Sequence, residues 1–163
     1  MKKLLFFLAG LFMLNSGYSQ LKQTTICPDV VIDILDGKIN NALFATSTIG
    51  EIKSVLPCYS SVEEENSSSK CGGTVFYKDK DLYFYTGRDY VEIREKFKGK
   101  LTLPLMGAAR NSLFKMLGNP KIKDVNWDAF QMAYGILILY YKNGKVNKIQ
   151  FSTKHTDSIN LCE

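Results

Sequence analysis

Residue types on which catalysis depends are scarce in this chain of 163 residues. It has one histidine, His155, in a polar stretch near the C-terminus. A cysteine nucleophile needs a histidine base and a third residue that orients that base, so this stretch makes a poor reaction centre. The chain has no C-x2-C pair of the kind that binds zinc. It also lacks a glycine-rich phosphate loop, because Gly72-Gly73 precedes a predicted strand and not a helix. The sequence therefore predicts no enzyme, no metal site and no cofactor.

A clustered basic stripe is missing as well. The formal net charge is +5, spread along the chain, and the densest basic cluster, residues 94–100, is short and interrupted by Glu95. Nucleic-acid binding usually shows as such a stripe, so we expect no nucleic-acid partner.

The acidic residues leave a glycosidase pair or a calcium site as alternatives. Asp79 and Asp81 are more simply explained by a hairpin turn, and the glutamates at 63–65 by a solvated loop.

No apolar run in the sequence is long enough to span a bilayer. The N-terminus combines two lysines at 2–3 with an apolar stretch at 4–14 and small residues at positions 17 and 19. This pattern is typical of a secretory signal peptide. We expect residues 1–19 to be removed and residues 20–163 to form a single domain that is periplasmic or secreted. A membrane-anchoring helix at the N-terminus is the alternative.

Four cysteines in an exported chain predict disulfides. Three pairings are possible. Cys58 and Cys71 flank a polar loop, while Cys27 and Cys162 lie near the two ends of the expected domain. We therefore predict the pairs Cys58–Cys71 and Cys27–Cys162.

The clearest structural signal is a hairpin between Gly135 and Phe151. Two apolar segments, Ile136–Tyr141 and Val146–Phe151, flank Asn143-Gly144. Asn-Gly favours a two-residue type I′ turn, which needs positive φ at both central residues. The first segment is apolar on both faces, so we expect it in the middle of a sheet. Further strands are expected at Val30–Leu35, with Ile39–Ala45 as its hairpin partner, and at Thr74–Lys78, Leu82–Thr86, Asp89–Phe97 and Asp128–Tyr134.

Two short helices are expected. Thr48 and Glu51 form a capping-box pattern that begins a helix, and Pro57 ends it. A second helix is expected at 108–117. Each helix precedes a loop and an aromatic-rich hairpin, which predicts approximate repeats over residues 46–97 and 106–152. The expected fold is α+β: two short helices packed on one face of an antiparallel sheet, built as a tandem helix–hairpin repeat. A coincidental order of elements in an α+β domain is the alternative.

The second half of the chain carries a resemblance. It has Leu117-Gly118-Asn119-Pro120, then a loop with tryptophan and tyrosine, then a hairpin of the form apolar-Tyr-Tyr-x-Asn-Gly-Lys-Val-x-x-Ile. This layout resembles β-lactamase-inhibitor-like proteins and the small lipoprotein of the outer-membrane β-barrel assembly machinery (the SmpA/OmlA type). The resemblance is best over 108–152 and looser over 46–97. It implies a helix–sheet module that binds other proteins without catalysis. The chain lacks the lipobox cysteine of the assembly lipoprotein.

The candidate binding residues are aromatic. Tyrosines on the polar side of the strands are expected to form an exposed platform beside an arginine, because tyrosine and arginine anchor many protein interfaces. The alternative is that these rings pack on the core or on loops. The candidates are Tyr83, Tyr85, Tyr90, Arg94 and Tyr140. The expected function is a module that binds another protein of the cell envelope or exterior, of the inhibitor, immunity or envelope-assembly type. The alternative is a carrier of a small ligand or envelope polymer, with an apolar cavity between helices and sheet.

Overall fold

The computed structural model describes residues 25–64, 71–158 and 162, which include eleven strands and two α-helices. The predicted signal peptide and residues 65–70 of the predicted polar loop lie outside the described residues. The strands are β1 (Val31–Asp33), β2 (Lys38–Ile39), β3 (Ser61–Glu63), β4 (Thr74–Tyr77), β5 (Leu82–Tyr85), β6 (Tyr90–Arg94), β7 (Lys100–Leu101), β8 (Ile122–Lys123), β9 (Trp127–Met132), β10 (Gly135–Lys142) and β11 (Lys145–Ser152). The helices are α1 (Ile49–Val55) and α2 (Phe114–Leu117), and single 3-10 turns occupy Thr86–Arg88 and Arg110–Ser112.

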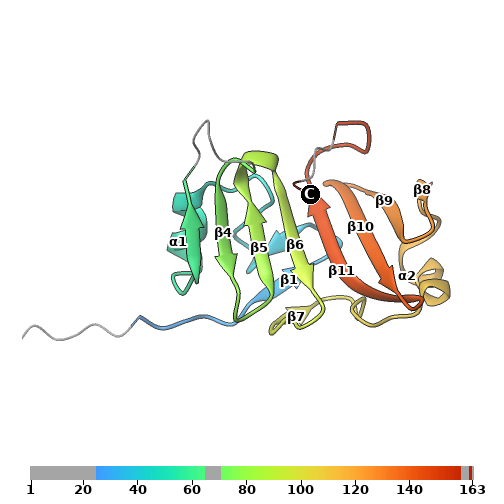
Figure 1. Cartoon of the computed structure of the whole chain (residues 1–163), viewed down its shortest axis with the longest axis horizontal. Helices are drawn as coiled ribbons and strands as arrows, with labels where there is room; N and C mark the ends of the chain where they lie inside the picture. Colours follow the sequence, from blue (N-terminus) through green and yellow to red (C-terminus); the bar gives the residue numbers. More distant parts are fainter. Residues whose placement is uncertain (1–24, 65–70, 159–161, 163) are drawn as a thin grey trace, which may run out of the picture.

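The larger sheet has eight strands, all antiparallel to their neighbours, in the order β3-β4-β5-β6-β11-β10-β9-β8. Strands β3 to β6 form one meander and β8 to β11 form another (Figure 1). The two meanders join where β6 pairs with β11, with Glu92 opposite Gln150 in the register. Residues far apart in sequence therefore become neighbours in the middle of the sheet.

The predicted hairpin is confirmed as β10 and β11, each one residue longer at both ends than the predicted segment. Asn143 and Gly144 have φ values of 53° and 72°, as a type I′ turn requires. As expected, β10 is an inner strand, and Leu137 and Leu139 on it are fully buried. The register between the two strands shifts at Tyr140 and Tyr141, where a β-bulge lies. The bulge makes Asn147 an extra residue on β11.

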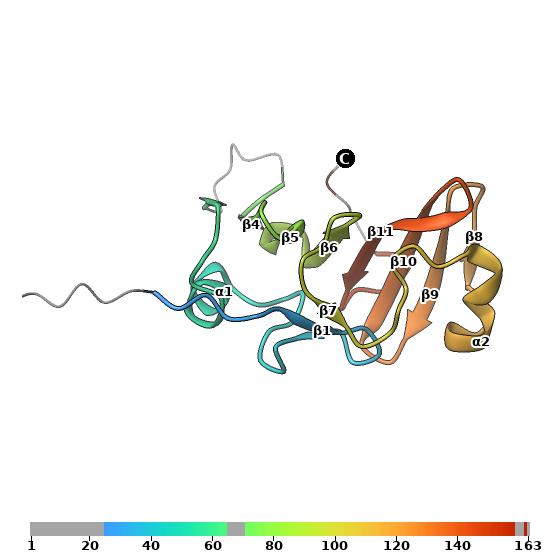
Figure 2. The same cartoon turned by 90° about the horizontal axis from the view of Figure 1, so that it is seen from below.

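A second, three-stranded sheet covers the inner face of the large one. Its order is β2-β1-β7, with β1 parallel to β7. Ile32 and Ile39 of this sheet are fully buried in one core with Phe84, Ile93 and other inner-face side chains of the large sheet. Figure 2 shows β1 and β7 on one side of the large sheet, with α1 toward one end of the molecule and α2 toward the other. The two helices therefore cover only the ends of the core.

The α+β prediction is wrong. The protein is mostly β, with eleven strands in two sheets among the described residues, and its two short helices do not form a layer on the sheet. The expected tandem helix–hairpin repeat over 46–97 and 106–152 is not the basis of the fold. The layer that the helices were expected to provide is supplied by β1, β2 and β7. β1 falls within the strand expected at Val30–Leu35, and β2 ends where its expected hairpin partner begins. β7 was not expected, because its two residues are too few to leave a clear period-2 pattern.

The first helix was predicted well, and the second was not. The Thr48 hydroxyl accepts the Glu51 N–H at 3.3 Å and the Glu51 carboxylate accepts the Thr48 N–H at 2.8 Å, so the capping box is formed. In the second segment, α2 has only four residues. The chain before it is held extended instead, because Val146 N–H donates to the Ala108 carbonyl at 3.0 Å and Arg110 N–H donates to that of Gly144 at 3.0 Å. Pairing with the hairpin overrides the helical pattern there.

All four cysteines form disulfides, but the predicted pairing is wrong. The bonds are Cys27–Cys58 and Cys71–Cys162, with Cα–Cα distances of 5.5 and 5.4 Å. Cys58 precedes β3 and Cys71 precedes β4, and these strands run antiparallel with Ser61 opposite Phe76. The two cysteines consequently lie at opposite ends of a hairpin and not at the base of one loop.

The two disulfides indicate an oxidising environment, outside the cytoplasm of the cell. Within the described ranges, no helix combines the length and the apolar character needed to cross a bilayer.

Candidate functional site

The five candidate residues lie on one face of the large sheet, the outer face, which is opposite the small sheet. The register aligns three cross-strand rows on this face, and every candidate belongs to one of them. The rows are Phe76-Tyr83-Glu92-Gln150-Ile138-Ala129, Thr74-Tyr85-Tyr90-Ser152-Ile136-Gln131 and Arg94-Lys148-Tyr140-Trp127. Because side chains alternate along a strand, these residues share the face while their neighbours fill the core. We call Phe76, Tyr83, Tyr85, Tyr90, Glu92, Arg94, Tyr140, Lys148 and Gln150 the outer-face cluster.

The aromatic side chains at one end of this cluster pack against each other. The ring of Phe76 meets those of Tyr83 and Tyr85 edge-on, with centroids 5.4 and 5.6 Å apart, and Tyr85 stacks on Tyr90 at 4.5 Å. Tyr83 and Tyr85 are each only 8% exposed and Tyr90 is fully buried. Of the two arrangements that the sequence left open, these three rings adopt the packed one and do not form an exposed platform. The Tyr90 hydroxyl donates to the Cys162 carbonyl at 3.3 Å and accepts its N–H at 3.1 Å, which ties the C-terminal cystine to this cluster.

A buried carboxylate organises the centre of the cluster. Glu92 is 4% exposed and accepts hydrogen bonds from the Arg94 guanidinium and, at 2.6 Å, from the Gln150 amide. The ammonium of Lys148 lies 3.9 Å from the same carboxylate. Two cations and an amide donor thus compensate one buried negative charge, as burial of a carboxylate demands.

Both cations also lie over aromatic rings. The Arg94 guanidinium is 4.0 Å from the centroid of the Tyr83 ring, and the Lys148 ammonium is 3.8 Å from that of Tyr140. The Arg94 side chain is still 45% exposed and that of Lys148 30% exposed. Each cation is therefore fixed in place by a ring and a carboxylate while it still faces solvent.

The environment shifts several pKa values on this face. Burial raises the pKa of Tyr83, and its hydrogen bond to Asp81 raises it further. Burial and then the charge of Glu92 raise the pKa of Tyr85. Burial lowers the pKa of Arg94, because it disfavours the charged guanidinium. The hydrogen bond and the charge of Glu92 outweigh this effect, so the pKa of Arg94 is raised overall. At neutral pH the cluster therefore holds neutral phenols around a permanent cation.

Alkaline pH is expected to destabilise the protein. Burial raises the pKa of Tyr77, Tyr90, Tyr134 and Tyr141 well above the ordinary value of 10.0. The folded protein keeps these protons after the unfolded chain has released them, so their stabilising effect is complete below pH 10 and is lost as pH rises above it. Each tyrosine contributes about 1.4 kcal/mol per pH unit to this loss. Urea unfolding at a series of pH values, with phenolate absorbance, measures the slope.

A single substitution checks this assignment. Tyr77→Phe removes one of these phenols and is expected to reduce the slope above pH 10 by about 1.4 kcal/mol per pH unit. The same variant loses the hydrogen bond from its hydroxyl to the Leu56 carbonyl, which lowers stability equally at all pH values below 10. An unchanged slope would contradict the assignment.

A hollow of about 210 Å³ lies between α2 and the β8–β9 end of the sheet, where an apolar ligand cavity was a sequence-based alternative. Its lining includes the ion pair between Arg110 and Asp128. The Arg110 guanidinium also donates to the carbonyls of Asp124 and Val125 at 2.6 and 3.0 Å, so its donors are engaged within the protein. A charged pair that holds parts of the fold together therefore lines this hollow, which is not an apolar cavity.

Sequence reasoning missed four members of the outer-face cluster and one neighbour. Glu92, Lys148 and Gln150 alternate with core residues in segments that were predicted as strands, so their face was predictable. What the sequence does not show is that Glu92 and Gln150 are buried, since polar residues at such positions usually meet water. Phe76 was in a predicted strand, and Trp127, beside Tyr140, preceded the predicted start of β9.

Comparison of the chain with protein-family models, with curated proteins and with solved structures found no match.

Proposed function

We propose that this chain is an exported, non-enzymatic module that binds another protein, as an inhibitor, an immunity-type protein or an envelope-assembly factor does. Cleavage after residue 19 would release it into the periplasm or the exterior, which agrees with the oxidising environment that the two disulfides indicate. The resemblance to inhibitor-like and SmpA/OmlA-type modules is part of this proposal and is not its main support.

The observation that carries the proposal is the fixed pair of cations on the outer face. Free arginine and lysine side chains lose about 2 kcal/mol of rotamer entropy when they are immobilised. Arg94 and Lys148 are already held by Glu92 and by the rings of Tyr83 and Tyr140. A partner that contacts them avoids much of that cost, which is how a preorganised surface gains affinity.

The composition around these cations also fits an interface. Phe76, Trp127 and Tyr140 are half-buried on the same face, so each offers an apolar edge beside the charges. Arginine, tryptophan and tyrosine are the residues that most often dominate binding energy. All four cysteines form disulfides, so no free thiol remains to act as a nucleophile. His155 is not on the outer face of a strand.

A binding experiment tests the proposal. The chain of residues 20–163, immobilised, captures proteins from envelope and extracellular fractions, and mass spectrometry identifies the partner, whose Kd is then measured with the purified protein. We expect Arg94→Ala with Lys148→Ala to weaken binding at least tenfold, because buried or fixed charges at an interface each contribute about 1 kcal/mol or more.

The control is Lys38→Ala with Lys115→Ala, which removes the same charge from β2 and α2, away from the outer face. This variant should bind as the unchanged chain does. Equal binding by both double variants, or no specific capture at all, would refute the proposal.

A further inference from the structure

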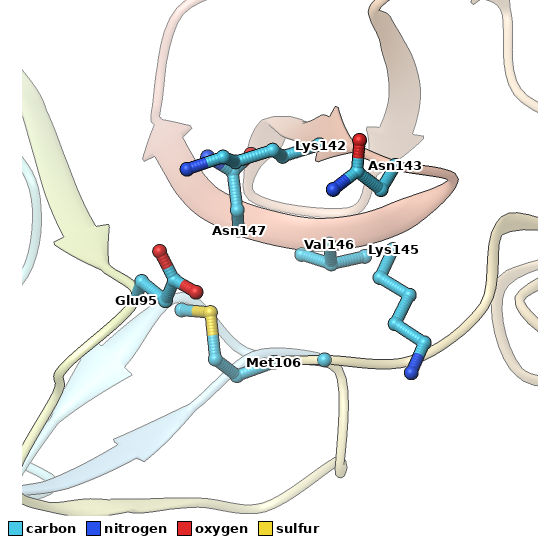
Figure 3. A pocket seen from close by; sticks show the side chains of 8 residues that line it. Glu95, Met106, Lys142, Asn143, Lys145, Val146 and Asn147 are labelled. Carbon is cyan, nitrogen blue, oxygen red and sulfur yellow. The ribbon is translucent and has the colours of Figure 1, made fainter.

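A groove lies at the end of the large sheet where β6 stops and β11 continues (Figure 3). Two hollows of about 650 and 360 Å³ form it, and they share Glu95 and Asn147. We call it the hairpin groove. In Figure 3, Asn147 and Val146 belong to β11, and Glu95 and Met106 lie across from them.

The backbone explains why the groove is there. On the side of β11 that faces β6, pairing with β6 ends at Lys148, opposite Arg94. Beyond it the chain before α2 replaces β6: Gly107 N–H donates to the Val146 carbonyl at 2.8 Å and Val146 N–H to that of Ala108 at 3.0 Å. The bulge residue Asn147 lies between these two neighbours. The groove is thus a fixed gap between two pairing partners of one strand, and β-bulges are common next to functional sites.

Positive charge dominates the lining of the groove. The two hollows together are lined by five cations and two acids: Arg94, Lys96, Lys142, Lys145 and Lys148, against Asp81 and Glu95. Asp81 is occupied within the protein, because its carboxylate accepts the Lys96 N–H at 2.9 Å and the Tyr83 hydroxyl at 3.1 Å. Glu92, which pairs with Arg94 and Lys148, adds a third acid, so five cations against three acids leave a net charge of +2 at the groove.

Two of these cations repel each other and so destabilise the hairpin. Lys142 and Lys145 are directly opposite each other in the register, on either side of the Asn-Gly turn, and like charges in such positions destabilise a hairpin. Within the described residues neither ammonium has an ion-pair partner in the protein. Both are exposed, so both can reach a ligand in the groove. An anion bound there would convert their repulsion into attraction.

We propose that the hairpin groove holds an extended acidic segment of the protein partner, with carboxylates at Lys142 and Lys145. This inference deepens the proposed function and rests on it. A peptide is favoured because the half-buried Met106 lines the same groove and offers a place for an apolar side chain, which a uniformly charged polymer lacks. The groove opens beside Arg94 and Lys148, so one partner can contact it together with the outer-face cluster.

The first test uses defined peptides and the whole exported chain. A fluorescent peptide of repeated Glu-Gly units should bind, and its Gln-Gly counterpart should not. Lys142→Gln with Lys145→Gln should weaken binding of the acidic peptide roughly tenfold, since each exposed ion pair contributes about two- to fivefold. Lys38→Gln with Lys115→Gln removes the same net charge elsewhere and should change it less than twofold. Equal loss in both variants would show a non-specific charge effect and overturn the inference.

Two further outcomes separate this inference from the proposed function. If Lys142→Gln with Lys145→Gln leaves the Kd of the captured partner unchanged while Arg94→Ala with Lys148→Ala weakens it, the function stands and the groove assignment fails. If the acidic peptide binds the groove but no protein partner is captured, the proposed function fails. Polyphosphate and a sulfated glycan serve as competitors. Tighter, Lys142- and Lys145-dependent binding of either would replace the peptide as the occupant and overturn the assignment.

Discussion

Replacing Gly135 by alanine is expected to lower the free energy of unfolding by about 4 kcal/mol or more. Gly135 begins β10 with a φ of +147°, a conformation that side-chain-bearing residues rarely adopt. A Cβ at this position would lie 2.2 Å from the Ser152 carbonyl oxygen and 2.7 Å from the backbone of Thr153. These are main-chain atoms in or next to the β11 ladder, so they cannot move aside without breaking the pairing of β10 with β11. Urea unfolding of the variant measures the effect.

Gly144→Ala provides the matched control. Gly144 also has a positive φ, +72°, but nothing lies within 4 Å of the position of its Cβ. Alanine there meets only the intrinsic cost of the left-handed conformation, about 1–2 kcal/mol. A Gly135 variant that lost no more stability than the Gly144 variant would mean that the close approach of β10 and β11 does not constrain this position.

Removal of the Cys71–Cys162 disulfide is the second large effect. The bond joins residues 91 apart in sequence, and the loop-entropy model assigns such a crosslink about 4.6 kcal/mol. It also holds Cys162 against the Tyr90 hydroxyl, next to the stacked rings of Tyr85 and Tyr90. We expect Cys71→Ser with Cys162→Ser to lose most of that stability and to expose the two rings. Urea unfolding without reductant, followed by tyrosine fluorescence, measures both.

The other disulfide gives the comparison. Cys27–Cys58 joins residues 31 apart, for which the same model gives about 3.7 kcal/mol. Cys27→Ser with Cys58→Ser should therefore cost less, and it should leave the tyrosine signal of the outer face unchanged. If this variant proved the less stable of the two, loop length would not be what sets the contribution of these bonds.

The sequence predicted the local parts of the fold and missed those that depend on distant residues. The Asn143-Gly144 turn and the Thr48 capping box were correct, because each depends on chemistry within a few residues. The addition of β7 to the small sheet was missed because β7 is two residues long and pairs with β1 from far away in the sequence. Without it, the inner face of the large sheet needed another cover, and the helices were wrongly given that role.

The candidate site was predicted in position but not in exposure. Alternation along the strands placed Tyr83, Tyr85 and Tyr90 on one face correctly. Their burial follows from side chains that the alternation does not reveal: the ring of Phe76 and the C-terminal Cys162. The groove beside Lys145 could not be predicted from the sequence, because it forms where β6 ends and another segment takes its place beside β11.

The joint between β6 and β11 also determines when the proposed binding surface can form. Arg94 belongs to the first meander and Lys148 to the second. The Glu92 carboxylate, which orients both cations, is hydrogen-bonded to Gln150, which lies 58 positions further along the sequence. Each meander closes from local contacts, whereas this joint must wait for a long loop to close. Neither half alone carries the paired cations, so a nascent or proteolytically split chain lacks part of the surface proposed to bind a partner. The proposed binding surface would then form only after the two meanders join, and a refolding assay that follows complex formation would report that step.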